Sequence, residues 1–247
     1  MMTVSDFIAK LKYAASVKTL YVKGCFGAPM TESNKTRYIN ASTYNKNRAA
    51  MINAADSNTF GFDCVCLIKG ILWGWTGDNT KIYGGASYTS NGVPDISEAG
   101  MINACPDAST DFSNIQAGEV VYMSGHIGVY IGDGQVIECT PSWSNNVQYS
   151  WLGNLSQYKK DHYRIWTKHG HIPYVDYSAS PEPTPTGEWT VLDISRYQTN
   201  ITYSAAASSV KGVIMRVGYR GNSDGTLSKD SMIDTHYNGF QSIKRQV

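Results

Sequence analysis

The chain has 247 residues, of which 42% are hydrophobic, and its formal net charge at neutral pH is +1. This length allows one large domain or two smaller ones, and the hydrophobic fraction is sufficient for a packed core. The small net charge argues against a protein that binds nucleic acid or anionic membranes through general electrostatic attraction.

The N-terminal segment 5–16 has the apolar periodicity of an amphipathic helix, and Asp6, Lys10 and Lys12 interrupt its apolar pattern. A secretory signal peptide needs an uninterrupted apolar stretch, so none is expected here. No segment approaches the length that spans a bilayer. We therefore expect synthesis in the cytoplasm without a secretory leader and no insertion into a membrane.

Helical patterns continue early in the chain, and strand patterns follow after them. Helices are predicted at 36–55 and 64–73, and strands at 119–123, 126–132, 135–140 and 162–169, with Gly, Asn and Asp turns between the strands. Helices followed by an antiparallel sheet predict an α+β domain over residues 1–177.

A proline-rich segment, "SASPEPTPTGEW", marks a boundary between domains. Residues 178–187 have the composition of a stiff, extended linker. Beyond it, strand patterns at 189–195 and 212–219 alternate with helical ones, so residues 188–247 resemble the start of a parallel α/β fold.

Five cysteines occur in the chain: Cys25, Cys64, Cys66, Cys105 and Cys139. Their odd number leaves at least one thiol free, and their spacing matches no zinc site, so we expect neither a metal nor a disulfide framework. Cys64 stands at the start of a predicted helix, where backbone N–H groups favour a thiolate. It is therefore a candidate nucleophile, although a cysteine before an apolar run is more often a packing residue.

The segment "HIGVYIGDGQVIEC" predicts a hairpin whose register can be tested by side-chain alternation. A three-residue loop at 132–134 places the five apolar residues Ile127, Val129, Ile131, Ile137 and Cys139 on one face. His126, Tyr130 and Glu138 then share the other, non-core face, with His126 and Glu138 as diagonal neighbours. The order Cys, His, acid is that of papain-like enzymes, in which the acidic or polar residue orients the histidine.

The segments "FDCVCLIKG" and "IQAGEVVYMSGHIGVYIGDGQVIEC" resemble the NlpC/P60 family of cell-wall cysteine peptidases, which are papain-like and related to CHAP amidases. Two positions depart from the family pattern: Val65-Cys66 replaces Ser-Gly, and Gly118-Glu119 replaces Gly-Asp. The resemblance implies that Cys64 is the nucleophile, His126 the general base and Glu138 the group that orients it. It also implies that Asp63 binds a substrate amine and that no cofactor is needed.

Four aromatic residues, Trp73, Trp75, Tyr122 and Trp143, are candidates for stacking on a sugar or peptide. The alternative for Trp73 and Trp75 is that they belong to the core.

After the linker, "WTVLDISRYQTN" and "GVIMRVGYRG" resemble the opening of family 25 glycoside hydrolases, with Asp193 at the position of the first-strand aspartate and Arg216 on the second strand. A complete (β/α) barrel needs about 200 residues or more. Glycoside cleavage uses two carboxylates, and the later acidic pair of that family is absent. We therefore expect a truncated segment without glycosidase activity.

Both resemblances indicate bacterial peptidoglycan as the partner and suggest a phage endolysin or an autolysin that acts at the cell wall after release. The expected reaction is hydrolysis of a stem-peptide amide, with the D-glutamyl–diamino acid bond as one candidate. Two alternatives remain: an N-acetylmuramoyl-L-alanine amidase with the same triad, and a non-catalytic wall-binding module with a structural Cys64.

Overall fold

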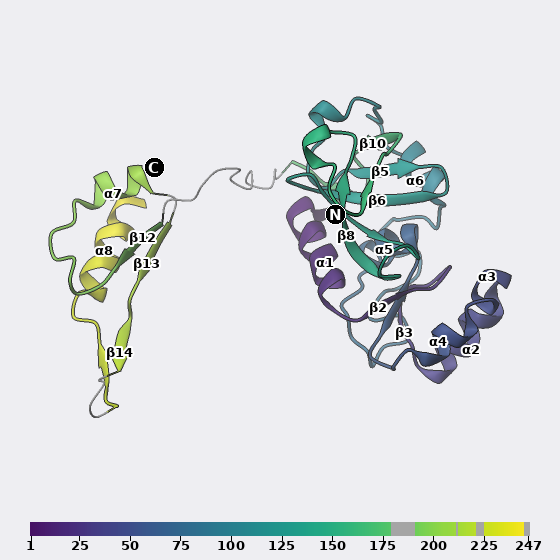
Figure 1. The fold of residues 1–247 in the computed structure, drawn as a ribbon, viewed down its shortest axis with the longest axis horizontal. Helices are drawn as coiled ribbons and strands as arrows, with labels where there is room; N and C mark the ends of the chain where they lie inside the picture. The colour runs from purple at the N-terminus through teal and green to yellow at the C-terminus, as the bar shows by residue number, and fades with distance from the viewer. Residues whose placement is uncertain (179–190, 211, 221–224, 245–247) are drawn as a thin grey trace. The chain divides into compact units, whose positions relative to one another are not determined.

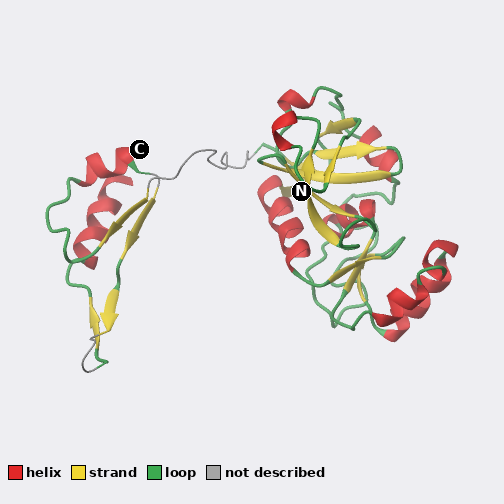
Figure 2. Cartoon of the chain, viewed as in Figure 1, coloured by secondary structure: helices red, strands yellow, loops and turns green. Residues whose placement is uncertain are grey.

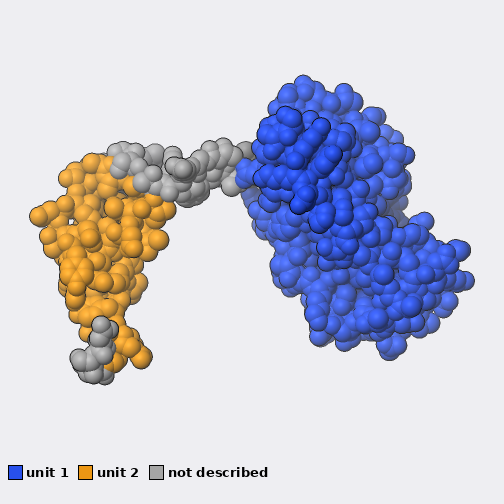
Figure 3. Space-filling view, in the orientation of Figure 1, with its two compact units in different colours: residues 1–184 blue, residues 185–247 orange. Residues whose placement is uncertain are grey.

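The computed structural model describes residues 1–178, 191–210, 212–220 and 225–244. The chain divides into two compact units, residues 1–184 and 185–247 (Figure 3). The predicted linker at 178–187 lies outside the described residues except for Ser178, so its conformation stays a prediction.

Unit 1 combines helices with two main sheets (Figure 2). Its helices are α1 (Val4–Ser16), α2 (Glu32–Ala41), α3 (Thr43–Lys46), α4 (Ala49–Ala54), α5 (Cys64–Leu72) and α6 (Glu98–Asn103), with 3-10 turns at Phe112–Asn114 and Ser156–Tyr158. Its strands are β1 (Met2–Thr3), β2 (Thr19–Tyr21), β3 (Phe26–Pro29), β4 (Phe60–Phe62), β5 (Val120–Met123), β6 (His126–Gly132), β7 (Gln135–Cys139), β8 (Val147–Leu152), β9 (Tyr163–Arg164), β10 (Lys168–Gly170) and β11 (Val175–Asp176).

The larger sheet has the strand order β10-β5-β6-β7-β8-β9. Only three residues, 165–167, separate β9 from β10, although the two strands occupy opposite edges of the sheet. The sheet must therefore curl until its edges approach each other. The prediction of one strand over 162–169 is wrong, because the chain crosses from one edge to the other within that segment.

The β6–β7 hairpin has the predicted pairing along its body, with Val129 opposite Ile137 and Tyr130 opposite Val136. The turn differs from the prediction. Gly132 pairs with Gln135, which leaves a two-residue Asp133-Gly134 turn, and Ile131 forms a bulge. The bulge absorbs one residue, so the predicted sorting of the two faces is preserved despite the shorter turn.

One face of this hairpin packs in the main core together with α5, α1 and the smaller sheet. All five residues predicted for the apolar face belong to that core. We expected the other face to lie outside the core. Instead, a second apolar cluster that includes Tyr130, Val136 and Trp166 covers it. The curl of the sheet explains this correction, because it turns the second face into an interior.

Helices α2, α3 and α4 form a helical insert between β3 and β4, at the end of unit 1 away from β5 and β10 (Figure 1). The predicted single helix over 36–55 is interrupted at Ser42, whose backbone is extended. The Ser42 side chain accepts a hydrogen bond from the backbone N–H of Asn45 and starts a new helix there. The insert is therefore a chain of short helices rather than one rod.

The smaller sheet has the order β2-β4-β3, with β2 parallel and β3 antiparallel to β4. Tyr21, at the end of β2, pairs with Phe62, at the end of β4. Because Asp63 and Cys64 follow directly, this sheet delivers the chain to the start of α5.

Unit 2 begins as a parallel β-α-β arrangement. It contains β12 (Val191–Ile194), α7 (Tyr203–Ser209), β13 (Gly212–Met215), β14 (Gly218–Arg220), β15 (Leu227–Lys229) and α8 (Ile233–Lys244). Strands β12 and β13 pair in parallel, and β14 pairs with β15 as a separate antiparallel ribbon. The predicted strand over 212–219 is therefore split between two pairs, and the resemblance to the start of a barrel stays a prediction.

Within the described ranges, no helix combines the length and apolar character needed to cross a bilayer.

Candidate active site

Cys64 is the first residue of α5, a helix whose nine residues are all buried. Asp63 caps this helix: one carboxylate oxygen accepts from the backbone N–H of Cys66 at 2.7 Å, and the other accepts from the backbone N–H of Gly24 at 2.7 Å. The charge of Asp63 before an apolar helix is thus explained by capping. Each oxygen accepts one backbone hydrogen bond, and the expected role of Asp63 in binding a substrate amine stays a prediction.

Cys64 is 8% exposed, and its thiol lies at the backbone N–H of Ile127, the residue after His126. Burial raises the pKa of this thiol to about 12, and the negative charge of Asp63 adds to the effect. The N–H group of Val65, at the start of the helix, and that of Ile127 lower the pKa, but by less. The effect expected from the helix N-terminus is thus outweighed by burial, and ionisation of the thiol needs a proton acceptor.

His126 and Glu138 form the predicted pair, with 2.6 Å between His126 Nε2 and a Glu138 carboxylate oxygen. An ionised carboxylate only accepts hydrogen bonds, so Nε2–H of His126 donates to Glu138. Burial raises the pKa of Glu138, but its hydrogen bond and electrostatic interaction with His126, together with the charge of Arg164, outweigh burial and hold the pKa below its ordinary value. Glu138 is therefore an ionised carboxylate that orients the imidazole.

Three further residues hold this pair. Arg164 Nε donates to both oxygens of Glu138, at 2.7 and 3.0 Å, and Ser150 Oγ donates at 2.5 Å. The ring of Trp166 stacks on His126 with a centroid separation of 5.6 Å. Sequence reasoning missed these residues, because 164–166 reach the pair only through the curl of the sheet. An arginine within an apolar strand pattern was the one available signal for Arg164.

Gly128 makes room for the pair on the inner face of the hairpin. A Cβ atom at this position would lie 2.8 Å from Val136 Cγ1 and 3.3 Å from Glu138 Cβ. The contact with Val136 is too close for ordinary carbon atoms, so a larger residue at position 128 would displace Val136 and press on Glu138 beside it. Gly128 thus contributes to the site through the space that it leaves.

Tyr21 is a further residue that sequence reasoning missed. Burial raises the pKa of its phenol, and the negative charges of Cys64 and Asp63 raise it further. Its position follows from the pairing of β2 with β4, which brings residue 21 beside the strand that ends before Cys64. Because β2 and β4 are distant in the sequence, no local pattern indicates that the two strands pair.

The four aromatic candidates differ in position. Trp73 and Trp75 are 2% and 0% exposed, and their indole N–H groups donate to the carbonyls of Val93 and Gly27. Stacking of these two on substrate is therefore excluded, and the core alternative is correct. Tyr122 is half-buried and pairs with Ile127 on the α5 side of the sheet.

Trp143 is 40% exposed in the turn between β7 and β8. Its ring lies 4.5 Å from the guanidinium carbon of Arg164 and stacks on His162. Trp143 is therefore connected to Glu138 through Arg164 and still has surface available to a ligand.

Asp193 lies on β12 in unit 2, where it is exposed and pairs with Ile214. Arg216 forms an ion pair with buried Asp230 at 2.9 Å. The predicted role of Asp193 in binding substrate stays a prediction.

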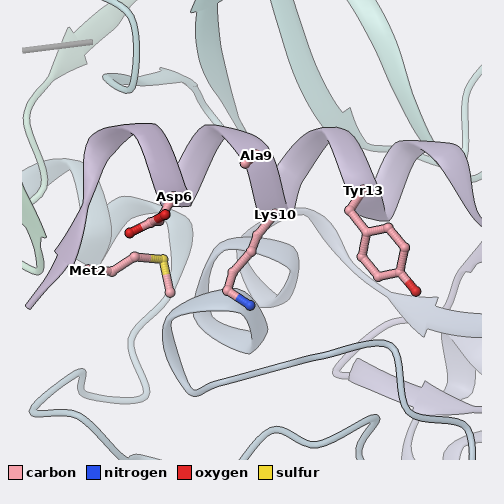
Figure 4. A pocket seen from close by; sticks show the side chains of 5 residues that line it. All are labelled: Met2, Asp6, Ala9, Lys10 and Tyr13. Carbon is pink, nitrogen blue, oxygen red and sulfur yellow. The ribbon is translucent and has the colours of Figure 1, made fainter. Parts of the chain in front are cut away.

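A shallow hollow on the outer face of α1 is lined by Met2, Asp6, Ala9, Lys10 and Tyr13 (Figure 4). Its lining holds no pair of a nucleophile and a base. In the part of the chain that the structure describes, no group of three or more His, Cys, Asp or Glu residues is arranged to hold a metal ion.

No protein-family profile and no curated protein matches this chain. Among solved structures, the chain is similar to the P60 domain of an antigen from M. avium subspecies paratuberculosis, with 16% identity, a TM-score of 0.38, and coverage of 68% of this chain and 93% of that one. It is also similar to the peptidoglycan hydrolase RipB from Mycobacterium tuberculosis, with 17% identity, a TM-score of 0.37, and coverage of 70% of this chain and 65% of that one. Because these identities and TM-scores are low, the chemistry of this chain must be inferred from its own residues.

Proposed function

We propose that unit 1 is a cysteine-dependent amide hydrolase that cuts the peptide part of bacterial peptidoglycan. The observation that carries this proposal is that the thiol of Cys64 meets the backbone N–H of Ile127, while the buried Glu138 engages Nε2 of the preceding residue, His126, and leaves Nδ1 to accept a proton. The substrate class comes from the resemblance of the sequences around Cys64 and His126 to cell-wall peptidases.

In the proposed reaction, His126 Nδ1 takes the thiol proton as Cys64 Sγ attacks the scissile carbonyl. The backbone N–H of Cys64 contributes to stabilising the oxyanion. The imidazolium then protonates the leaving amine, and the C–N bond breaks to give a thioester. Water, deprotonated by His126, hydrolyses the thioester and regenerates the thiol.

The raised pKa of Cys64 makes the general base essential to this scheme. A buried thiol alone would also suit a non-catalytic wall-binding module, and a second buried carboxylate, Glu119, holds His169 elsewhere in unit 1. His126 differs from His169 because the next residue, Ile127, directs its backbone N–H to the Cys64 thiol, and this favours the hydrolase.

Mass spectrometry of purified peptidoglycan digested by the full chain tests the proposal. New amino groups on the diamino acid would identify an endopeptidase, and new L-Ala amino groups an amidase. Cys64→Ala should abolish the products. Cys105→Ala is the matched control, because Cys105 is also a buried free thiol whose pKa is raised to about 12 by burial. Products that are unchanged in Cys64→Ala would refute the proposal.

A further inference from the structure

Arg48 lies between α3 and α4 in the helical insert, and its guanidinium group is held by neutral acceptors. They are the carbonyl oxygen of Tyr21 and the hydroxyl of Tyr44, both at 3.4 Å, the sulfur of Met51 at 3.4 Å and the side-chain oxygen of Asn145. Its Nε–H is buried and has no hydrogen-bond partner among the described residues. The same part of the chain places no carboxylate within ion-pair distance of Arg48.

Three other cations of unit 1 that lie inside or partly inside the fold are neutralised. Lys35 pairs with Glu32, Lys69 with Asp95, and Arg164 with Glu138. Within the described part of the chain, the partly buried Lys10 has no ion pair and donates to the carbonyl of Trp75. Withdrawing a cation from water without a counter-ion costs free energy. Arg48, which also has a buried N–H without a partner among the described residues, therefore marks a position that an anion from outside the chain can occupy.

Arg48 is also linked, through Tyr21, to the strand that leads into the nucleophile. The guanidinium carbon lies 5.7 Å from the centre of the Tyr21 ring and 5.3 Å from that of Tyr44. Tyr21 in turn pairs with Phe62, two residues before Cys64. Tyr21 thus contacts the cation that has no counter-ion among the described residues and pairs with the strand that ends before Cys64.

The β7–β8 turn fixes this arrangement from the other side. The carbonyl of Asn145 accepts from the backbone N–H of Tyr21 at 3.0 Å, while its side-chain oxygen accepts from Arg48. The same turn carries Trp143, which contacts Arg164. The insert, the turn and the end of β2 therefore meet at Tyr21.

We propose that Arg48 binds a substrate carboxylate close to the scissile amide, such as the free α-carboxylate of a γ-linked glutamyl residue. The inference rests on the proposed function for the identity of the substrate. A guanidinium fork binds a carboxylate through two parallel hydrogen bonds, and the flanking tyrosine rings limit competition from water. Amidation of that carboxylate removes the charge and one acceptor, so the site would select the free acid.

Binding is measured by calorimetry with full-length Cys64→Ala protein, which does not depend on turnover. The probes are L-Ala-γ-D-Glu-L-Lys and the same peptide with the glutamyl α-carboxylate converted to a carboxamide. The free acid should bind on the order of tenfold more tightly, as expected for charge-assisted hydrogen bonds. Arg48→Gln should remove this preference, and Arg48→Lys should retain part of it.

Arg37→Gln is the matched control. Arg37 belongs to the same insert but is exposed and contacts Tyr83 rather than Tyr21. This variant should keep the preference for the free acid. Equal binding of the two peptides by the parent, or an unchanged preference in Arg48→Gln with a normal circular dichroism spectrum, would overturn the carboxylate site.

Turnover of the same two peptides by protein with Cys64 intact separates this inference from the proposed function. Hydrolysis of both peptides with the same selectivity in wild type and Arg48→Gln would retain the hydrolase and refute the role of Arg48. Binding that depends on Arg48, without any hydrolysis, would support the carboxylate site and refute the hydrolase.

Discussion

Replacement of Glu138 by Gln tests whether the buried carboxylate orients His126. The change preserves the volume of the side chain and removes its charge. Glu138 is fully buried and accepts hydrogen bonds from His126, Ser150 and Arg164. Glutamine has one carbonyl oxygen and an NH₂ group, so it cannot accept from all three donors. A donor must then face either His126 Nε2 or Arg164.

The size of the effect follows from these contacts. If the amide NH₂ faces His126, the imidazole is driven to the tautomer with hydrogen on Nδ1, which removes the lone pair needed for proton abstraction. Loss of the orienting carboxylate in a catalytic triad lowers kcat by up to about 10⁴-fold, and we expect a loss of about 10²-fold or more in kcat/KM. Arg164 also loses its counter-ion, which costs about 3–5 kcal/mol of unfolding free energy when such a pair is buried.

The assay compares kcat/KM on a soluble peptidoglycan peptide with urea unfolding of the same preparations. Glu119→Gln is the matched control, because Glu119 is also buried and hydrogen-bonds to a histidine, His169, in unit 1. It should lose stability but keep kcat/KM per folded molecule. The reasoning is refuted if Glu138→Gln lowers kcat/KM no more than Glu119→Gln does.

The pH dependence of unfolding gives a second readout for Glu138. Its pKa in the folded protein is below the ordinary value of 4.5. A lowered folded-state pKa contributes stability above the unfolded-state pKa, and this stability is lost as the pH falls through the folded-state pKa. The unfolding free energy of the wild type should therefore fall more steeply below about pH 5 than that of Glu138→Gln, and equal slopes would contradict the assignment.

Three further outcomes are expected. Because burial raises the pKa of Cys64 to about 12, its rate of alkylation by iodoacetamide should still rise above pH 8, and His126→Ala should slow the reaction at pH 7; a plateau near neutrality would contradict this. Gly128→Ala should displace Val136, press on Glu138 and cost about 1–3 kcal/mol of unfolding free energy, with a loss of kcat/KM measured on the folded fraction. Trp75→Ala should cost about 3–5 kcal/mol in urea unfolding, and a variant of full stability with weakened substrate binding would restore the groove interpretation.

Local patterns in the sequence identified the parts of the site that depend on residues close together in the chain. The apolar run that begins at Cys64 predicted a helix over 64–73, and α5 begins at Cys64 and ends at Leu72. Alternation along the hairpin places His126 and Glu138 on one face, because side chains change face at every residue and only one register separates apolar from polar positions. Even the unexpected bulge at Ile131 leaves this sorting intact.

The tertiary structure decided what lies around that pair. Arg164 and Trp166 reach it because the sheet curls, and Tyr21 lies beside the strand that ends before Cys64 because β2 pairs with β4 across the helical insert. Burial also sets the high pKa of the Cys64 thiol and commits Trp73 and Trp75 to the core. These outcomes depend on which distant segments pack together and exclude water, and neither spacing nor periodicity along the chain contains that information.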